Sequence, residues 1–148
     1  VAPNASAISG GVVGRCTGYA YPCTLRNLVN YGEVAHRGSS VSAFAGGVIG
    51  VCEGGAGFVR CEIVNCLNYA SVTVSDGQAG CVSYVGGTFG YLGTYGYVAN
   101  CVNTGTLATN TADKYFGGCG GYLGPYSRGV SNYWSADAGS ESAYGSGR

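Results

Sequence analysis

The chain has 148 residues, a typical length for one domain, and its seven basic and seven acidic residues cancel. Only 9% of the residues are charged and no run of 18 apolar residues occurs, so we expect neither nucleic-acid binding nor insertion into a membrane. The 29 glycines follow no strict every-third-residue period, which excludes collagen, and a hydrophobic content of 46% disfavours disorder.

A Gly-Gly block that begins with a large apolar or aromatic residue recurs four times along the chain. The blocks read Ile8-Ser-Gly-Gly-Val-Val-Gly14, Phe44-Ala-Gly-Gly-Val-Ile-Gly50, Tyr84-Val-Gly-Gly-Thr-Phe-Gly90 and Tyr115-Phe-Gly-Gly-Cys-Gly-Gly121. Apolar residues at alternating positions around each block, such as Val12 and Cys16 in the first, indicate half-buried strands. Because glycine has no side chain, we expect these blocks to let two walls of a narrow coil approach closely.

A second block, ending in an asparagine, follows each Gly-Gly block in the same order. Its asparagines are Asn30, Asn68, Asn103 and Asn132. In a stacked repeat these amides would lie above one another and could hydrogen-bond as a ladder. Each asparagine could equally adopt a left-handed turn conformation that bends the chain. Two motifs that recur four times in one order predict a fold in which each repeat forms one coil.

The two blocks together resemble the GLUG-type repeat of bacterial and protist surface proteins, which reads Gly-Gly-hydrophobic-hydrophobic-Gly and then Asn-Cys-x-Asn-x-Gly. The resemblance extends from Ile8 to about Trp134, with Leu28 in place of Cys in the first repeat and Gly129 and Val130 in place of Asn-Cys in the fourth. It implies an extracellular β-solenoid module of a cell-surface or adhesive protein. It implies no enzymatic activity and carries over no catalytic residue.

We therefore predict an all-β fold, a disulfide-stapled β-solenoid of four imperfect repeats of roughly 30–40 residues, as a single domain over residues 1–148. The repeats cover about residues 8–43, 44–83, 84–114 and 115–136, and a Gly/Ser-rich tail follows at 137–148. No capping segment is evident at either terminus, so we expect both end coils to expose strand edges. The expected contacts between copies are Ile8 and Val12 at one end and Tyr133 and Trp134 at the other.

Eight cysteines, an even number, favour disulfides in an oxidising, extracellular compartment. No C-x-x-C pair occurs and His36 is the only histidine, so the spacing argues against a zinc site. Equivalent repeat positions predict bonds within one coil, and a shared Asn-Cys position allows bonds between coils. The predicted pairs are Cys16 with Cys23, Cys52 with Cys61 and Cys66 with Cys101, which leaves Cys81 with Cys119.

The sequence offers few groups for catalysis. His36, next to Arg37, lies in a loop-like stretch, and we expect it to be solvated rather than catalytic. The acidic residues are scattered, and Gly117–Gly121 lacks the Lys-Ser/Thr of a phosphate-binding loop. We therefore expect no enzyme, no cofactor and no metal ion. Asn4 begins the only N-glycosylation sequon, whose use the sequence leaves open.

Tyrosines are the most suggestive functional residues of the chain. Seven of them would form an aromatic stripe along one edge of the solenoid: Tyr19, Tyr21, Tyr91, Tyr95, Tyr97, Tyr122 and Tyr126. Such a stripe could bind sugars or another protein, or could instead close the ends of a thin core.

These observations favour a structural, non-catalytic repeat unit of an extracellular filament or cell-surface layer that assembles end to end with copies of itself. A net charge near zero removes the repulsion that would oppose this assembly. The second hypothesis is a surface adhesin or carbohydrate-binding module with glycan partners. The third hypothesis is a β-helix enzyme that acts on polysaccharides.

Overall fold

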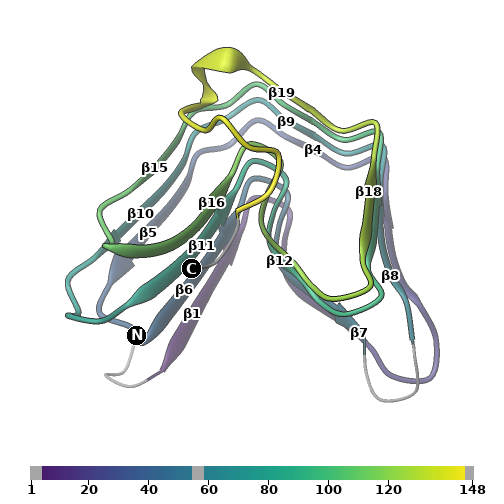
Figure 1. The fold of residues 1–148 in the computed structure, drawn as a ribbon, viewed down its shortest axis with the longest axis horizontal. Helices are drawn as coiled ribbons and strands as arrows, with labels where there is room; N and C mark the ends of the chain where they lie inside the picture. The colour runs from purple at the N-terminus through teal and green to yellow at the C-terminus, as the bar shows by residue number, and fades with distance from the viewer. Residues whose placement is uncertain (1–4, 55–58, 146–148) are drawn as a thin grey trace.

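The computed structural model describes residues 5–54 and 59–145, and in these ranges the protein is all-β. Its parallel strands form stacked sheets, an arrangement consistent with a β-solenoid (Figure 1). Strands that are far apart in the sequence lie side by side in each sheet, as β1 (Ser6–Gly10) and β6 (Ser42–Gly46) do. The prediction of an all-β fold with stacked parallel strands is therefore confirmed.

The chain passes through five sheets in a fixed order, once in each layer of the stack. Layer 1 contains β1, β2 (Val13–Gly18), β3 (Cys23–Arg26), β4 (Val29–Asn30) and β5 (Val34–Gly38). Layer 2 contains β6, β7 (Ile49–Gly54), β8 (Cys61–Val64), β9 (Leu67–Asn68) and β10 (Val72–Asp76). Layer 3 contains β11 (Val82–Gly86), β12 (Phe89–Leu92), β13 (Tyr97–Ala99), β14 (Val102–Asn103) and β15 (Leu107–Thr109). Layer 4 contains β16 (Asp113–Gly117), β17 (Gly120–Leu123), β18 (Arg128–Val130) and β19 (Tyr133–Trp134), so the fifth sheet has three strands and the others have four.

The register aligns equivalent residues of successive layers in columns. Phe44 pairs with Ile8 on one side and with Tyr84 on the other, and Tyr84 pairs with Tyr115. This is the register that an alignment of the four Gly-Gly blocks predicts. Because each column repeats at the spacing of neighbouring strands, side chains of one kind stack directly upon one another.

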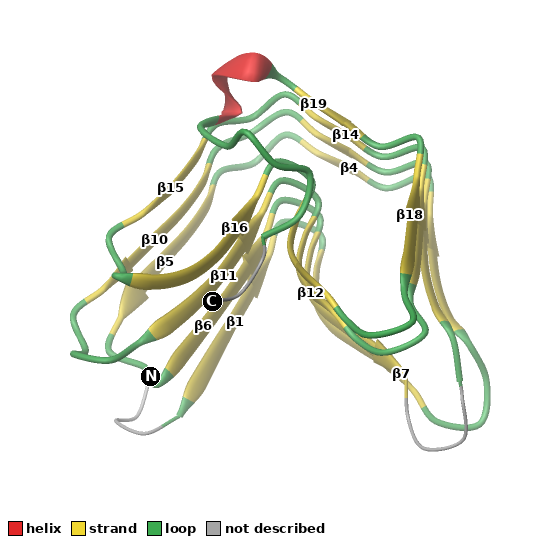
Figure 2. Ribbon diagram, viewed as in Figure 1, coloured by secondary structure: helices red, strands yellow, loops and turns green. Residues whose placement is uncertain are grey.

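The cross-section of the stack is notched, and the interior is divided into two apolar cores. The first and second sheets form the two sides of the notch, seen at β16 and β12 in Figure 1. One core, which includes Ile63 and Phe89, contains residues of the second and third sheets. The other core, which includes Val74 and Val85, contains residues of the first and fifth sheets. A short helical turn, η1 (Ala136–Ala138), follows β19 (Figure 2).

The Gly-Gly blocks form the corner between the first and second sheets, at the apex of the notch. A Cβ atom added to Gly47 would collide with the side chain of Asn68, and one added to Gly87 would collide with Asn103. A Cβ atom at the preceding glycine of the block, Gly46, would collide with backbone atoms of Ile49. Both glycines are therefore required because the backbone and the asparagines occupy the space of a side chain.

We expect Gly47→Ala to destabilise the fold by about 3 kcal/mol, because the added methyl group overlaps the Asn68 amide. Gly14→Ala is the matched control, since nothing lies within 4 Å of a Cβ atom at that position. We expect the control to change the free energy of unfolding by less than about 0.5 kcal/mol. Chemical denaturation of both variants measures the difference, and equal stabilities would contradict the packing of the corner.

Candidate functional site

Three stacked asparagines line the interior where the fourth sheet faces the Gly-Gly corner. Nδ2 of Asn30 donates to Oδ1 of Asn68 at 2.9 Å, and Nδ2 of Asn68 donates to Oδ1 of Asn103 at 2.8 Å. The same amides donate to nearby backbone carbonyls, so these buried polar groups are well satisfied. The left-handed backbone conformation, the other possibility for these asparagines, occurs instead three residues earlier, at Asn27, Asn65 and Asn100.

The ladder ends in layer 4, where the register places Trp134 and not Asn132 beside Asn103. The prediction that Asn132 belongs to the ladder is therefore wrong. Asn132 follows β18, and its Oδ1 accepts a hydrogen bond of 2.9 Å from the backbone amide of Cys101. The ring of Trp134 fills the space beside Gly118 that asparagine side chains fill beside the equivalent glycines. The sequence alignment missed this because the fourth Asn block is displaced by two residues.

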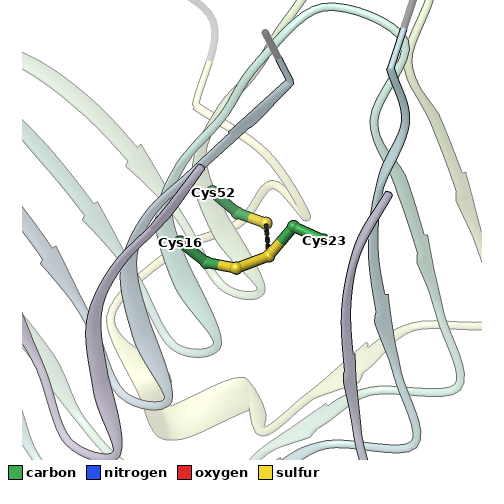
Figure 3. The surroundings of a disulfide bond; sticks show 3 residues. All are labelled: Cys16, Cys23 and Cys52. Carbon is green, nitrogen blue, oxygen red and sulfur yellow. Dashed lines mark hydrogen bonds between the residues drawn. A yellow bond between two sulfur atoms is a disulfide. The ribbon is translucent and has the colours of Figure 1, made fainter. Parts of the chain in front are cut away.

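Four cysteines from two adjacent layers gather at the first core, and Figure 3 shows three of them, Cys16, Cys23 and Cys52. Cys16 and Cys23, the pair predicted for the first coil, form a disulfide with Cα atoms 6.4 Å apart. The Sγ of Cys52 lies 3.9 Å from that of Cys23, and the sulfurs of Cys16, Cys23 and Cys52 all lie within 4.8 Å of one another. The register pairs Cys52 with Cys16 and Cys61 with Cys23, which brings all four side chains together.

The predicted pair Cys52 and Cys61 is in contact but carries two thiols in this structure. A hydrogen bond to Cys61 and burial raise the pKa of the Cys52 thiol far above its usual range. The same hydrogen bond, together with donation from the backbone amides of Gly18 and Cys23, lowers the pKa of Cys61 despite its burial. Cys61 is therefore the sulfur of this group that ionises first.

The remaining four cysteines occupy two separate places. Cys66 and Cys101 lie next to each other in successive layers, and their mutual hydrogen bond lowers the pKa of Cys66 to about 7. Cys119 lies near Cys101, with its Sγ 3.4 Å from the carbonyl oxygen of Tyr133. Cys81 packs in the other core, so its predicted bond with Cys119 is wrong. The chain path places these two residues at opposite ends of the first sheet, before β11 and after β16.

His36 is buried rather than solvated, with 6% of its surface exposed, which corrects the expectation of a loop residue. Its Nε2 lies 3.1 Å from Oδ2 of Asp76 in the next layer. The backbone amide of Gln78 donates to Oδ1 of Asp76 at 2.8 Å, and the hydroxyl of Ser40 donates to Oδ2. The alternation in β5, where Val34 is also buried, is the sequence signal that identifies this histidine as internal.

This polar cluster braces two layers and is not arranged as a nucleophile with its base. Burial alone would raise the pKa of Asp76, but hydrogen bonds from Ser40, Gln78 and His36 outweigh it and hold that pKa well below its usual range. The hydroxyl of Ser40 donates to the carboxylate and not to the imidazole, so the proton relay of a catalytic triad is not formed.

We expect Asp76→Asn to lower the free energy of unfolding at neutral pH by about 2–3 kcal/mol, because it removes a charged hydrogen-bond acceptor. The pKa of Asp76 is lower in the folded state than in the unfolded state. The carboxylate therefore makes its complete contribution to the free energy of unfolding at pH values above the unfolded-state pKa, and this contribution is lost as the pH falls toward the folded-state pKa. Urea denaturation between about pH 2 and pH 7 should therefore give a flatter profile for the variant. Asp113→Asn, at an exposed residue, is the control and should follow the parent.

Two columns of aromatic rings line the notch between the first and second sheets. Tyr84 stacks between Phe44 and Tyr115 with ring centroids 4.6 Å apart on both sides. Tyr91 stacks on Tyr122 at 5.1 Å, and the two columns meet edge to face, as Tyr115 and Tyr122 do at 5.2 Å. The ring faces are therefore largely used within the columns.

A cavity of about 340 Å³ opens in the notch at the first layers, where Arg15 and Val51 replace the tyrosines of the second sheet. Arg15 forms an ion pair with Glu53, and Tyr91 borders the same cavity. Burial raises the pKa of Tyr91, so its phenol stays protonated and can donate a hydrogen bond at neutral pH. Aromatic, cationic and anionic groups thus converge on one opening, as they do in many small-ligand sites.

The predicted tyrosine stripe is divided by the fold among several places. Tyr91 and Tyr122 line the notch, whereas Tyr95 and Tyr126 form a separate stack with ring centroids 5.2 Å apart. Tyr19 and Tyr21 are exposed in the loop between β2 and β3. Sequence reasoning predicts the first-sheet column but not its place in the notch, because the alternation around the Gly-Gly blocks indicates only half-buried strands.

Layer 1 is an open end of the stack among the described residues. All five of its strands are edge strands, and Val12 is 44% exposed. Ile8, predicted with Val12 as an assembly contact, is half-buried in the edge strand β1. Unpaired strand edges beside apolar side chains are templates for pairing with another chain.

The other end differs from the expectation of an unprotected coil, because the tail covers part of it. The amide of Gly118 donates to the carbonyl of Ser142 at 2.7 Å, and Tyr144 pairs with Gly120 as a strand of the next layer would. Nε1 of Trp134 donates to a tail carbonyl, so this predicted contact is half-buried, whereas Tyr133 stays 64% exposed. The Gly/Ser-rich composition of the tail gives no indication of this cap. The one sequence signal is that Ala143-Tyr-Gly145 resembles the end of a Gly-Gly block.

No family model, no curated protein and no solved structure matches the chain. The resemblance to GLUG-type repeats therefore rests on the two sequence motifs and stays a prediction. Among the described residues, no helix is long and apolar enough to cross a membrane. The possible glycosylation site Asn4 lies outside the described residues.

Proposed function

We propose that the protein is a structural, non-catalytic unit of an extracellular filament or cell-surface layer, built as a β-solenoid of four repeats stapled by disulfides. Its partners are other copies of the same chain. The observation that carries this proposal is the open layer 1, whose five edge strands leave backbone groups and the side chain of Val12 available to a second copy.

The two ends of the stack make the assembly directional. At the far end, β18 and β19 are edge strands of the third and fourth sheets, and Tyr133 is exposed beside them. The tail pairs with the neighbouring corner, so a second copy meets β18 and β19 first. Contact between two different surfaces is heterologous and propagates into a filament unless its rotation closes a ring.

We expect Val12→Lys and Tyr133→Asp each to shorten or abolish polymers, because a charge at either end must be desolvated when the ends meet. Sedimentation velocity and negative-stain imaging measure the length distribution. Glu53→Ala, in β7 of layer 2 and away from both ends, is the control and should assemble like the parent. A parent protein that stays monomeric at high concentration would contradict the filament and favour the second candidate.

The second candidate is a surface adhesin or carbohydrate-binding module, and the cavity in the aromatic notch supports it. A sugar ring in this cavity would contact Tyr91 and would hydrogen-bond to Arg15 and Glu53, which border the opening. The third candidate, an enzyme acting on polysaccharides, has less support. Asp76 and Asp113 border one open pocket, but Asp76 is buried and its carboxylate already accepts hydrogen bonds from within the fold.

For the second candidate, we expect a glycan bound on an array to lose about tenfold in affinity with Tyr91→Ala and with Arg15→Ala, since each removes one wall of the cavity. Tyr126→Ala removes a tyrosine that is 80% exposed and does not border the cavity, so binding should be unchanged. Equal loss in all three variants would place the binding elsewhere.

A further inference from the structure

The four cysteines of layers 1 and 2 lie close together, and the sulfur atoms of three of them, Cys16, Cys23 and Cys52, form one compact group. We propose that Cys16, Cys23, Cys52 and Cys61, when reduced, bind one thiophilic divalent cation such as zinc as a closed tetrathiolate site. The sequence alone argues against zinc because no C-x-x-C pair occurs. In the fold, the cysteines come together because the layers stack and not because they are close in the sequence. Each of the two layers contributes two cysteines, and the register places one pair directly on the other.

The positions of three of the sulfur atoms fit tetrahedral coordination. Zinc–sulfur bonds of about 2.3 Å place neighbouring sulfurs of a tetrahedral site about 3.8 Å apart. The Sγ atoms of Cys23 and Cys52 are 3.9 Å apart, and that of Cys16 lies within 4.8 Å of both. Cys61, which pairs in register with Cys23 and interacts with Cys52, is the fourth ligand of the proposed site, and its sulfur lies outside the set of three that are within 4.8 Å of one another. Rotation of the Cys61 side chain is therefore needed to bring four sulfurs around one ion.

The surroundings of the group also suit a metal. Cys23, Cys52 and Cys61 are buried, which keeps water from a closed site.

The set of sulfurs is complete at four because the next layers carry none at these positions. Leu92 and Leu123 continue the column of Cys16 and Cys52. In layer 3, a Cβ atom on Gly96, which precedes β13, would collide with the side chain of Leu92. In layer 3, an apolar side chain therefore fills the space that cysteine sulfur atoms occupy in layers 1 and 2.

Metal binding and disulfide formation are alternative states of the same four sulfurs. A thiol or phosphine reductant gives two electrons, and with two protons the Cys16–Cys23 bond becomes two thiols while the reductant is oxidised. The cation then displaces the thiol protons, which pass to the solvent. Because the group is buried, uptake accompanies folding of the reduced chain. This inference does not depend on the assembly proposed above.

Cobalt(II) is the probe that tests the site. The full chain is unfolded and refolded anaerobically with a phosphine reductant, and Co²⁺ is added. We expect one Co²⁺ per chain, with the sulfur-to-metal charge-transfer and intense visible bands of tetrahedral cobalt thiolate, and displacement of Co²⁺ by Zn²⁺. Circular dichroism of the same samples should show β structure that one equivalent of either ion restores or increases.

Single serine variants locate the ligands. Cys16→Ser, Cys23→Ser, Cys52→Ser and Cys61→Ser should each weaken binding by more than the roughly 100-fold that the loss of an outer partner costs. Cys81→Ser and Cys119→Ser change buried thiols outside the group and should bind Co²⁺ like the parent. A reduced parent chain that gives no thiolate bands, bands that survive Cys61→Ser, or equal loss in the Cys81→Ser control would each overturn the proposal.

Discussion

The contact between a glycine and a stacked asparagine amide holds the cross-section of this protein together. In each of the first three layers, the second glycine of the Gly-Gly block leaves the space that the asparagine of the same layer fills, as Gly87 does for Asn103. The asparagines in turn hydrogen-bond from layer to layer, so the corner is fixed along the stack. Because this contact lies between the two apolar cores, it explains why both motifs recur together.

Elsewhere in the stack, a column changes from a large to a small residue only where a side chain of a neighbouring layer fills the space. Gly120 continues the column of Ile49 and Phe89, and the ring of Phe89 fills the space that its missing side chain leaves. Tyr144 then closes the column over Phe89, with ring centroids 6.1 Å apart. Next to the sulfur group, the side chain of Leu92 likewise fills the space that Gly96 leaves. Volume is therefore conserved across layers rather than within one.

The two ends and the notch give the stack three different surfaces. Layer 1 is open among the residues that the structure describes, and the opposite corner is covered by the tail. The notch carries an aromatic wall with a charged opening at Arg15 and Glu53. An assembly through the ends leaves the notch free, so a filament that presents a row of binding sites is compatible with both proposals. The sulfur group is internal and bears on stability rather than on contacts.

The sequence by itself determined the stacking of the strands, the first-sheet column in register and the in-layer pair Cys16 and Cys23, and it allowed the asparagine ladder as one of two alternatives. These follow from local periodicity, since equal repeat positions must stack wherever the strands pair. The tertiary structure alone decided the notch, the pairing of His36 with Asp76, the separation of Cys81 from Cys119 and the cap made by Tyr144. Those contacts join segments of unequal length between the motifs, and no repeat fixes where such segments meet. Which residues share a corner depends on the path of the chain through space.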